Sequence, residues 1–189
     1  MLTSCLLYTV VGYLSGSIMF AVWLAKLRGR DVRAVGDKNP GAINAYKAAG
    51  PAIGTAALLL DFLKGALPVA AAILVAGLEG WWLVPVIIAP VVGHAFPVFQ
   101  RFRGGKAIDV TFGVWAGVTI WEVPTVMGAA MAVGMLVLRF KEDAKSMLLG
   151  MIVLVPFVAV RYRSLPMTAA ALLCASLVVW RHRRELAPR

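Results

Sequence analysis

Basic residues, paired glycines and a histidine gather in one stretch of the chain, Gly93–Lys106, which reads GHAFPVFQRFRGGK. An apolar segment arrives at His94 and Pro97, a short cationic loop follows, and Gly104–Lys106 leads into the next apolar segment. Paired glycines can expose backbone N–H groups, and an ammonium beside a helix start attracts an anion. Basic residues on their own would be explained as charges that set membrane topology. The histidine, the proline and the two glycines around them favour a phosphate site.

A second candidate region is the loop Gly29–Gly50, GRDVRAVGDKNPGAINAYKAAG, which is long for a simple connection between helices. Its glycines, proline and asparagines are typical of an ordered loop with positive φ angles and side-chain hydrogen bonds. Asn39, Asn44 and Lys47 supply amide donors and a cation, which suit a phosphorylated polar ligand. The alternative is a helix that lies on anionic lipid. The glycine and asparagine content favours the ligand loop.

Asp61 and Lys64 are the charges that fall well inside an apolar segment. At a spacing of i and i+3 they share a helix face and can form an ion pair. Ionisable groups in a membrane are costly and suggest function by default. Two interpretations stay open. Asp61 reaches a site that opens from the cytoplasm, or the pair clamps the loop Gly29–Gly50, which is the first inner loop.

The elements that must position these residues are membrane helices. The chain has 189 residues, of which 61% are hydrophobic and 15% charged, and its mean hydropathy is +0.84. Soluble domains have about 45–50% apolar and about 25% charged residues. The composition therefore predicts an all-α, polytopic integral membrane protein, with a single transmembrane helical domain over residues 1–189. The net charge of +10 sits in short clusters between apolar runs, which indicates contact with anionic membrane lipids rather than nucleic acid.

A metal centre is not expected. Cys5 and Cys174 lie far apart, no CxxC motif exists, and the histidines are His94 and His182. These residues lack the spacing of zinc ligands, so the sequence predicts neither a metal nor a cofactor.

Seven apolar segments approach the roughly 20 residues that a bilayer crossing needs. They are Cys5–Leu27, Ile53–Ala76, Trp82–Phe99, Ile108–Trp121, Val123–Leu138, Leu148–Val160 and Pro166–Trp180. The fourth to sixth are the shortest, and one of them is a candidate for an incomplete crossing. Most of the 19 basic residues, including Lys141 and Arg189, flank segment ends that share one side, whereas Arg161 and Arg163 lie on the other. The positive-inside rule then places the N-terminus outside and the C-terminus in the cytoplasm. No basic residue precedes the first segment, so we expect it to be retained rather than cleaved.

Small residues at four-residue spacing predict close helix packing within the chain. Gly12 with Gly16, and Gly113 with Gly117, would let neighbouring backbones approach in lipid.

Four motifs, taken in order, resemble one family. They are GSI (Gly16–Ile18), GDKNPGAIN (Gly36–Asn44), DFLKG (Asp61–Gly65) and GHAFPVFQRFRGGK (Gly93–Lys106). Their order and spacing are similar to those of the bacterial acyl-phosphate-dependent glycerol-3-phosphate acyltransferases, which are small seven-helix enzymes of the inner membrane. The last block is the most specific, and beyond it the resemblance rests on helix pattern alone.

The resemblance implies a reaction of phospholipid biosynthesis that uses no cofactor. The hydroxyl of glycerol 3-phosphate attacks the carbonyl of acyl phosphate, giving lysophosphatidate and inorganic phosphate. The donor already carries a good leaving group, so positioning and charge stabilisation can supply most of the catalysis. The HxxxxD motif of acyl-CoA acyltransferases is absent, since Phe99 rather than an aspartate follows His94 by five residues.

Carried onto this chain, the resemblance implies two groups of site residues. The catalytic positions are Asp37, Lys47, His94 and Lys106. The substrate-binding positions are Asn39, Asn44, Gly104, Gly105 and His182. The two glycines and Lys106 would hold phosphate beside His94, and the asparagines would orient glycerol phosphate.

Several positions depart from the family pattern. Asp37 stands where a serine is usual and Lys47 where an arginine is usual, so the bidentate phosphate geometry of arginine is lost. Near the C-terminus His182 and Arg183 fit, whereas Glu185 falls at an asparagine position and a final glutamate is absent. These departures leave open an alternative, a non-catalytic paralogue that binds glycerol phosphate or phospholipid. A transporter is a third interpretation, which no internal repeat supports, and the oligomeric state stays open.

Overall fold

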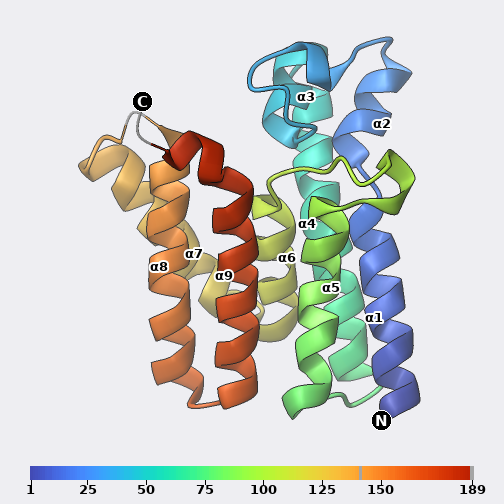
Figure 1. The fold of residues 1–189 in the computed structure, drawn as a ribbon, viewed down its shortest axis with the longest axis vertical. Helices are drawn as coiled ribbons and strands as arrows, with labels where there is room; N and C mark the ends of the chain where they lie inside the picture. The colour runs from blue at the N-terminus through green and yellow to red at the C-terminus, as the bar shows by residue number, and fades with distance from the viewer. Residues whose placement is uncertain (141, 188–189) are drawn as a thin grey trace.

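The computed structural model describes residues 1–140 and 142–187, and these residues form helices and connecting loops without a strand (Figure 1). Lys141 and Arg189, which the topology argument counted, lie outside the described residues. The α-helices are α1 (Leu2–Ser17), α2 (Phe20–Leu27), α3 (Ala42–Ala49), α4 (Pro51–Leu74), α5 (Leu83–Ala95), α6 (Ile108–Thr119), α7 (Glu122–Ala132), α8 (Asp143–Tyr162) and α9 (Leu165–Leu186). Three 3-10 turns, η1 (Val32–Ala34), η2 (Gly80–Trp82) and η3 (Val98–Gln100), lie between them, and the π-helical turn η4 (Val133–Val137) extends α7.

The helices form an elongated bundle with one elaborated end. In Figure 1, α1, α4 and α5 lie together on one side, α7, α8 and α9 lie on the other, and α6 lies between them. The N-terminus is at the lower end of this view, and the short helices α2 and α3, the loop after α5 and the end of α9 gather at the opposite end. The sequence-predicted site residues therefore come to one end of the bundle.

Among the described residues, five stretches are long and apolar enough to cross a membrane. They are Leu2–Leu27, Pro51–Leu74, Gly80–Gln100, Asp143–Tyr162 and Leu165–Leu186. Ile108–Thr119 and Glu122–Val137 are apolar but shorter, as their sequence predicted. The sixth predicted segment, Leu148–Val160, was expected to be short, but α8 extends beyond it at both ends. The last helix also continues past the predicted end at Trp180, to Leu186, because the basic residues after Trp180 remain helical.

The first predicted segment, Cys5–Leu27, is not one continuous helix. Ile18 and Met19 leave helical geometry, with ψ angles of 113° and 80°, and separate α1 from α2. The ion pair predicted on α4 contacts this break: Lys64 Nζ donates to the Ile18 carbonyl oxygen at 2.5 Å and lies 2.6 Å from Asp61 Oδ1. Both charged side chains are buried. The pair therefore holds the α1–α2 break, rather than clamping the first inner loop as one interpretation proposed.

Glycines bring the helices into backbone contact, as the small-residue spacing predicted. A Cβ at Gly16 of α1 would lie 2.2 Å from the Pro90 carbonyl oxygen of α5. A Cβ at Gly113 of α6 would lie 2.0 Å from the Phe62 carbonyl oxygen of α4. These glycines pack helices of the same chain against each other.

The first inner loop contains more helix than its composition indicated. Residues Val32–Ala34 form η1 and residues Ala42–Ala49 form α3, whose Ile43 and Tyr46 are exposed. Gly36–Gly41 is a turn segment, as the glycines and asparagines predicted, and the part that follows is a short helix with exposed apolar side chains.

Candidate functional site

Lys106 joins three segments that are far apart in the sequence. Its Nζ lies 2.5 Å from Asp37 Oδ2, in the first inner loop, and 2.7 Å from Glu185 Oε1, near the end of α9. The exposed fractions of the side chains are 42% for Asp37, 38% for Glu185 and 22% for Lys106. A cation and two carboxylates thus meet where a ligand from solvent can reach them.

The Asp37 carboxylate is held by the loop that carries it. Asn44 Nδ2 donates to Asp37 Oδ1 at 2.8 Å, and the Asn39 backbone N–H donates to the same oxygen at 3.1 Å. Asn44 Nδ2 also donates to the Asn39 carbonyl oxygen at 2.8 Å. Asp37, which accepts from the N–H two residues on, forms an Asx turn, and Asn44, buried in the first turn of α3, holds this turn with its two hydrogen bonds. Gly36 is required beside it, because its φ is +57° and a Cβ there would lie 2.4 Å from Asn44 Oδ1.

The paired glycines of the second inner loop, which connects α5 to α6, lie directly on His94. A Cβ on Gly104 would lie 2.1 Å from the His94 carbonyl oxygen, and a Cβ on Gly105 would lie 2.2 Å from His94 Nε2. The Gly105 N–H donates to the His94 carbonyl oxygen at 3.0 Å. The paired glycines predict an N–H that faces a phosphate, but in this structure the Gly105 N–H holds the loop against α5. His94 is 3% exposed, so it lies beneath the loop rather than at the open face.

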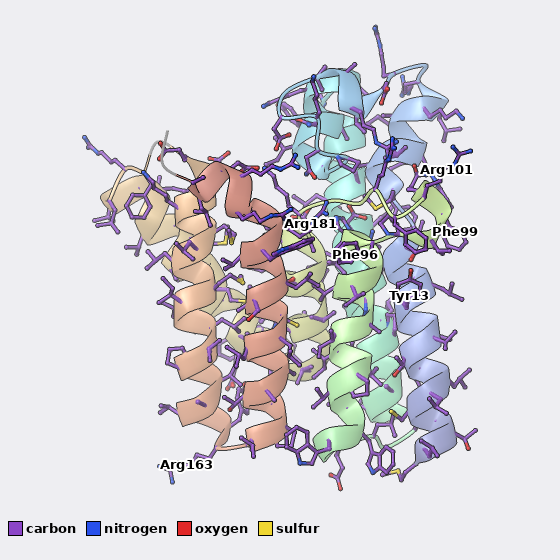
Figure 2. The ribbon with its side chains drawn as sticks, in the orientation of Figure 1. Tyr13, Phe96, Phe99, Arg101, Arg163 and Arg181 are labelled. Atoms are coloured by element: carbon purple, nitrogen blue, oxygen red, sulfur yellow. The ribbon has the colours of Figure 1, made fainter. Side chains whose placement is uncertain are left out.

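Arg181 of α9 holds the same loop from the other side. Its Nε donates to the Gly105 carbonyl oxygen at 2.9 Å and its Nη2 donates to the Gly104 carbonyl oxygen at 2.5 Å. The guanidinium also lies over the Phe96 ring, 5.7 Å from the centroid, between α9 and α5 (Figure 2). Arg181 of the C-terminal helix therefore holds the glycine loop, Gly104–Lys106, through two backbone carbonyl oxygens of that loop.

The charges of the cluster stabilise one another. Burial alone would raise the pKa of Asp37, but hydrogen bonds from Lys106, Asn39 and Asn44, with the charge of Lys106, hold that pKa below its ordinary value of 3.8. Burial alone would lower the pKa of Lys106, but its hydrogen bonds and charge interactions with Asp37 and Glu185 raise it above 10.5. Asp37 and Lys106 are therefore both ionised near neutral pH and form an ion pair.

Lys47 and His182 lie close to Asp37, Lys106 and Glu185 but form no hydrogen bond with them among the described residues. Lys47 is exposed on α3, and the point where a Cβ on Gly36 would lie is 3.4 Å from its Nζ. His182 is buried, and its Nδ1 lies 2.8 Å from the Val178 carbonyl oxygen. A carbonyl oxygen only accepts, so His182 Nδ1 carries the proton of this hydrogen bond.

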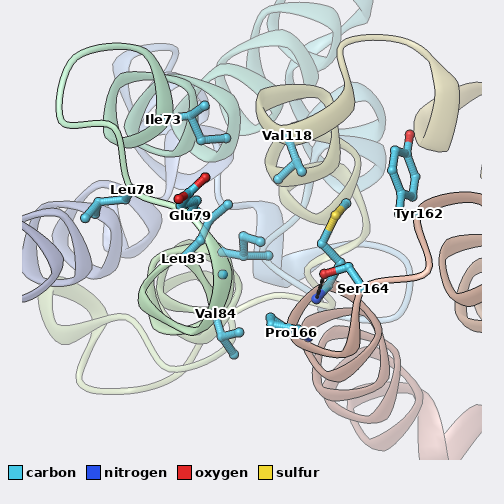
Figure 3. Close-up of a pocket in the computed structure, with 12 residues that line it drawn as sticks. Ile73, Leu78, Glu79, Leu83, Val84, Val118, Tyr162, Ser164 and Pro166 are labelled. Atoms are coloured by element: carbon cyan, nitrogen blue, oxygen red, sulfur yellow. Dashed lines mark hydrogen bonds between the residues drawn. The ribbon is translucent and has the colours of Figure 1, made fainter. Parts of the chain in front are cut away.

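The structure has a groove beside Lys47 and a separate cavity at the other end of the bundle. A groove of about 190 Å³ lies between α3 and α4, and Lys47 is one of the residues at its edge. It is lined by Ala42, Ile43, Tyr46, Lys47, Gly54, Thr55 and Leu58. A larger, mainly apolar cavity of about 290 Å³ involves Leu83 at the start of α5, Pro166 at the start of α9, and Glu79 (Figure 3). Because it lies at the end of the bundle remote from Lys106, it is not part of this site.

The predicted site residues form two connected sets, and a further pair lies beside them. Contacts join Asp37, Asn39, Asn44 and Lys106, and they join Gly104 and Gly105 to His94. Lys47 and His182 adjoin the cluster without a hydrogen bond to it among the described residues. Arg163, predicted on the opposite side of the membrane, lies at the other end of the bundle from Arg101 and Arg181 (Figure 2).

Sequence reasoning missed two residues of the site. Arg181 is one of the basic residues that the sequence predicts only to flank a segment end, and Glu185 is predicted only as a departure from the family pattern. Their signal was present, since both flank His182 in the run RHRRE at helical spacing. Only the packing of α9 against the second loop shows that they reach Gly104 and Lys106.

The chain matches one known protein family over nearly its whole length. The family model described as "Glycerol-3-phosphate acyltransferase" matches residues 6–188 of the chain. The chain belongs to the glycerol-3-phosphate acyltransferase family. Glycerol-3-phosphate acyltransferase 1 of Thermotoga maritima is 32% identical over 188 residues, covering 93% of each chain. Glycerol-3-phosphate acyltransferase 1 of Deinococcus radiodurans is 36% identical over 186 residues, covering 98% of this chain and 92% of the relative.

Solved structures of the acyltransferase family share the whole fold. The crystal structure of PlsY, an integral membrane glycerol 3-phosphate acyltransferase, in its glycerol 3-phosphate form is 32% identical, with a TM-score of 0.89. Its lysophosphatidic acid form is 30% identical, with a TM-score of 0.87. Both similarities cover 97% of this chain and 90% of the other. The all-helical integral membrane fold expected from the resemblance is therefore confirmed.

Proposed function

We propose that this chain transfers a fatty acyl group from acyl phosphate to the hydroxyl of glycerol 3-phosphate, forming lysophosphatidate. The observation that carries the proposal is the meeting of Asp37, Lys106 and Glu185 beside the glycine loop. Relatives named glycerol-3-phosphate acyltransferase, and solved structures of PlsY in glycerol 3-phosphate and lysophosphatidic acid forms, support this substrate and product class. The choice of acyl phosphate as donor rests on the motif resemblance.

In this proposal the cations bind the phosphates and the buried residues fix the cations. Lys106 and Lys47 contact phosphate oxygens, and Asn39 and Asn44 shape the turn that faces glycerol phosphate. His94 and Arg181 hold the glycine loop that carries Lys106. His182, one turn before the end of α9, completes the wall on the side of Glu185. The protein thereby positions two anionic substrates, and this positioning supplies most of the rate enhancement for a donor with a good leaving group.

The proposal includes a place in the cell. A single transmembrane domain crosses the bacterial inner membrane seven times, with the N-terminus outside and the site at the cytoplasmic face. The charge distribution supports this topology, as does the separation of Arg163 from Arg181 (Figure 2). Cysteine substitutions at Arg163 and Arg183, probed with a membrane-impermeant thiol reagent in intact cells, test it. Labelling of the first position alone is expected, and labelling of the second in intact cells contradicts it.

The activity test is direct. The purified protein in lipid nanodiscs, supplied with glycerol 3-phosphate and palmitoyl phosphate, should release phosphate and form lysophosphatidate in equal amounts. Palmitoyl-CoA in place of palmitoyl phosphate should give no product. Turnover with acyl-CoA alone would contradict the proposed donor.

A second candidate function is a non-catalytic paralogue that binds glycerol phosphate or phospholipid. The observation that favours it is that the Lys106 ammonium forms ion pairs with two carboxylates, Asp37 and Glu185. Both carboxylates stand at positions where the family usually has uncharged residues. Saturable binding of glycerol 3-phosphate without turnover, across donors of several chain lengths, would support this function over the enzyme.

A further inference from the structure

We infer that Asp37 is the general base of the acyl transfer, and that the phosphate of the donor activates it by drawing Lys106 away. This inference rests on the proposed function and assigns a role to a residue that departs from the family pattern. It makes Asp37 a catalytic residue that contacts the attacking hydroxyl, rather than a counter-ion of Lys106 alone.

The geometry separates the two carboxylate oxygens of Asp37. Oδ1 accepts from Asn44 Nδ2 at 2.8 Å and from the Asn39 N–H at 3.1 Å, which fixes the plane of the group. Oδ2 pairs with Lys106 at 2.5 Å. Once Lys106 moves to a phosphate, Oδ1 stays anchored and Oδ2 becomes the oxygen that can take a proton. A base must be held in this way within hydrogen-bond reach of the proton it removes.

The departure of Lys106 also changes the basicity of Asp37. With Lys106 beside it, the hydrogen bond and charge of the ammonium help to hold the pKa of Asp37 below 3.8, so the carboxylate is a weak base. A bound phosphate takes the cation away and places negative charge nearby, and both changes raise a carboxyl pKa. The other charged or titratable groups near Asp37 are Lys38, Lys47, Glu185 and His182. Glu185 shares Lys106 and adds to the rise, whereas Lys47 and Lys38 oppose it.

The other acid–base groups of the site are less suited to this role. His94 and His182 are 3% and 2% exposed, beneath the loop and within α9. Glu185 is accessible, but within the described residues its carboxylate contacts only Lys106 and lacks the two further donors that fix Asp37. Asp37 is the carboxylate that is both exposed and oriented.

The chemistry balances without a further reactant. Asp37 Oδ2 removes the hydroxyl proton of glycerol 3-phosphate as the hydroxyl oxygen forms a bond to the acyl carbon. The bond between the acyl carbon and the phosphate oxygen breaks, and its electron pair leaves on inorganic phosphate. The proton then passes from Asp37 to that phosphate, which restores the carboxylate.

The test compares Asp37→Asn with Asp31→Asn in nanodiscs. Asn at position 37 keeps an oxygen that accepts the Asn44 and Asn39 donors but cannot take the proton. Asp31 is a matched control, because it lies in the same loop and its carboxylate likewise accepts from the backbone N–H two residues on, of Arg33, at 2.9 Å. The pH dependence of kcat with saturating substrates is measured, since kcat reports groups of the enzyme–substrate complex.

We expect Asp37→Asn to lower kcat by about 10²- to 10⁴-fold, the usual contribution of a general base. The parent and Asp31→Asn should lose kcat toward acid pH through one ionisation, which Asp37→Asn should lack, and Asp37→Glu should restore part of both the rate and the ionisation. If Asp37→Asn keeps the parental kcat or gains activity, or keeps the ionisation while His182→Asn loses it, the inference is wrong although the proposed function stands. If the parent gives no lysophosphatidate, the proposed function fails, and this role of Asp37 fails with it.

Discussion

Arg181 Nη2 donates a hydrogen bond to the Gly104 carbonyl oxygen at 2.5 Å, which links the last helix to the second inner loop. The same guanidinium reaches the next carbonyl, of Gly105, through Nε at 2.9 Å. The planar fork of arginine makes both bonds at once, and lysine has no equivalent geometry. The loop that carries Lys106 is thus held by α5 beneath it and by α9 beside it.

Arg181→Ala should impair the acyltransferase more than its distance from Lys106 indicates. Hydrogen bonds from a charged donor contribute about 1.5–3 kcal/mol each, so losing the pair removes about 3–6 kcal/mol and should lower kcat/KM by about 10²- to 10⁴-fold. Arg181→Lys should recover only part of this loss. Arg183→Ala is the matched control on the same helix, because Arg183 is exposed and donates to the Trp180 carbonyl oxygen instead. Equal activity of Arg181→Ala and Arg183→Ala would contradict the assignment.

Gly105→Ala should displace the loop from His94. The added Cβ would lie 2.2 Å from His94 Nε2, and overpacking of this kind costs about 1–3 kcal/mol. We expect a lower unfolding temperature in detergent and a kcat/KM reduced at least 10-fold. Gly128→Ala, on α7, provides the control, because the nearest atom to its Cβ would be 3.7 Å away. Parental stability of Gly105→Ala would show that the loop shifts freely.

How far the sequence predicted this site depends on the range of the interactions. Glycine spacing, the Asp61–Lys64 pair and the polar composition of Gly29–Gly50 are local patterns, and the structure bears out the contacts they implied. The α1–α2 break was not predictable from local pattern, because the hydrogen bond at the break comes from a lysine on another helix. The same holds for Glu185, which reaches Lys106 only through the packing of α9.

Lys106→Ala should remove most of the turnover. Its ammonium is the cation shared by Asp37 and Glu185, and removing one donor that stabilises developing charge costs about 10²- to 10³-fold in kcat. Phosphate release from acyl phosphate and glycerol 3-phosphate measures the effect. Lys26→Ala is the control, because Lys26 is an exposed cation in the last turn of α2. A Lys106→Ala protein as active as the parent would place the phosphate site elsewhere.

The ion pair between Asp37 and Lys106 should persist over a wide pH range. The pKa of Asp37 is lowered from 3.8, so its stabilising contribution is present above that value and is lost as the pH falls through the lowered pKa. The pKa of Lys106 is raised from 10.5, so its contribution is complete below that value and is lost as the pH rises through the raised pKa. The difference in unfolding temperature between the parent and Asp37→Asn should therefore be constant from about pH 5 to about pH 9 and shrink below about pH 4. A difference that changes between pH 6 and pH 8 would show that another group controls the pair.

The buried pair of Asp61 and Lys64 should show strong coupling in a double-mutant cycle. Their side chains are 0% and 2% exposed, so removing one charge leaves the other uncompensated, which costs about 3–5 kcal/mol. Asp61→Asn and Lys64→Met should each lower the unfolding free energy, whereas the double variant should lose much less than the sum. The double variant also lacks the donor to the Ile18 carbonyl oxygen, so some loss should remain at the α1–α2 break. Lys145 and Glu142 are the control pair, with the same i, i+3 spacing but 53% and 43% exposed side chains, and their coupling should fall within about 0–1 kcal/mol. Additive losses at Asp61 and Lys64 would mean that solvent reaches the pair, and the break in the first membrane segment would then need another cause.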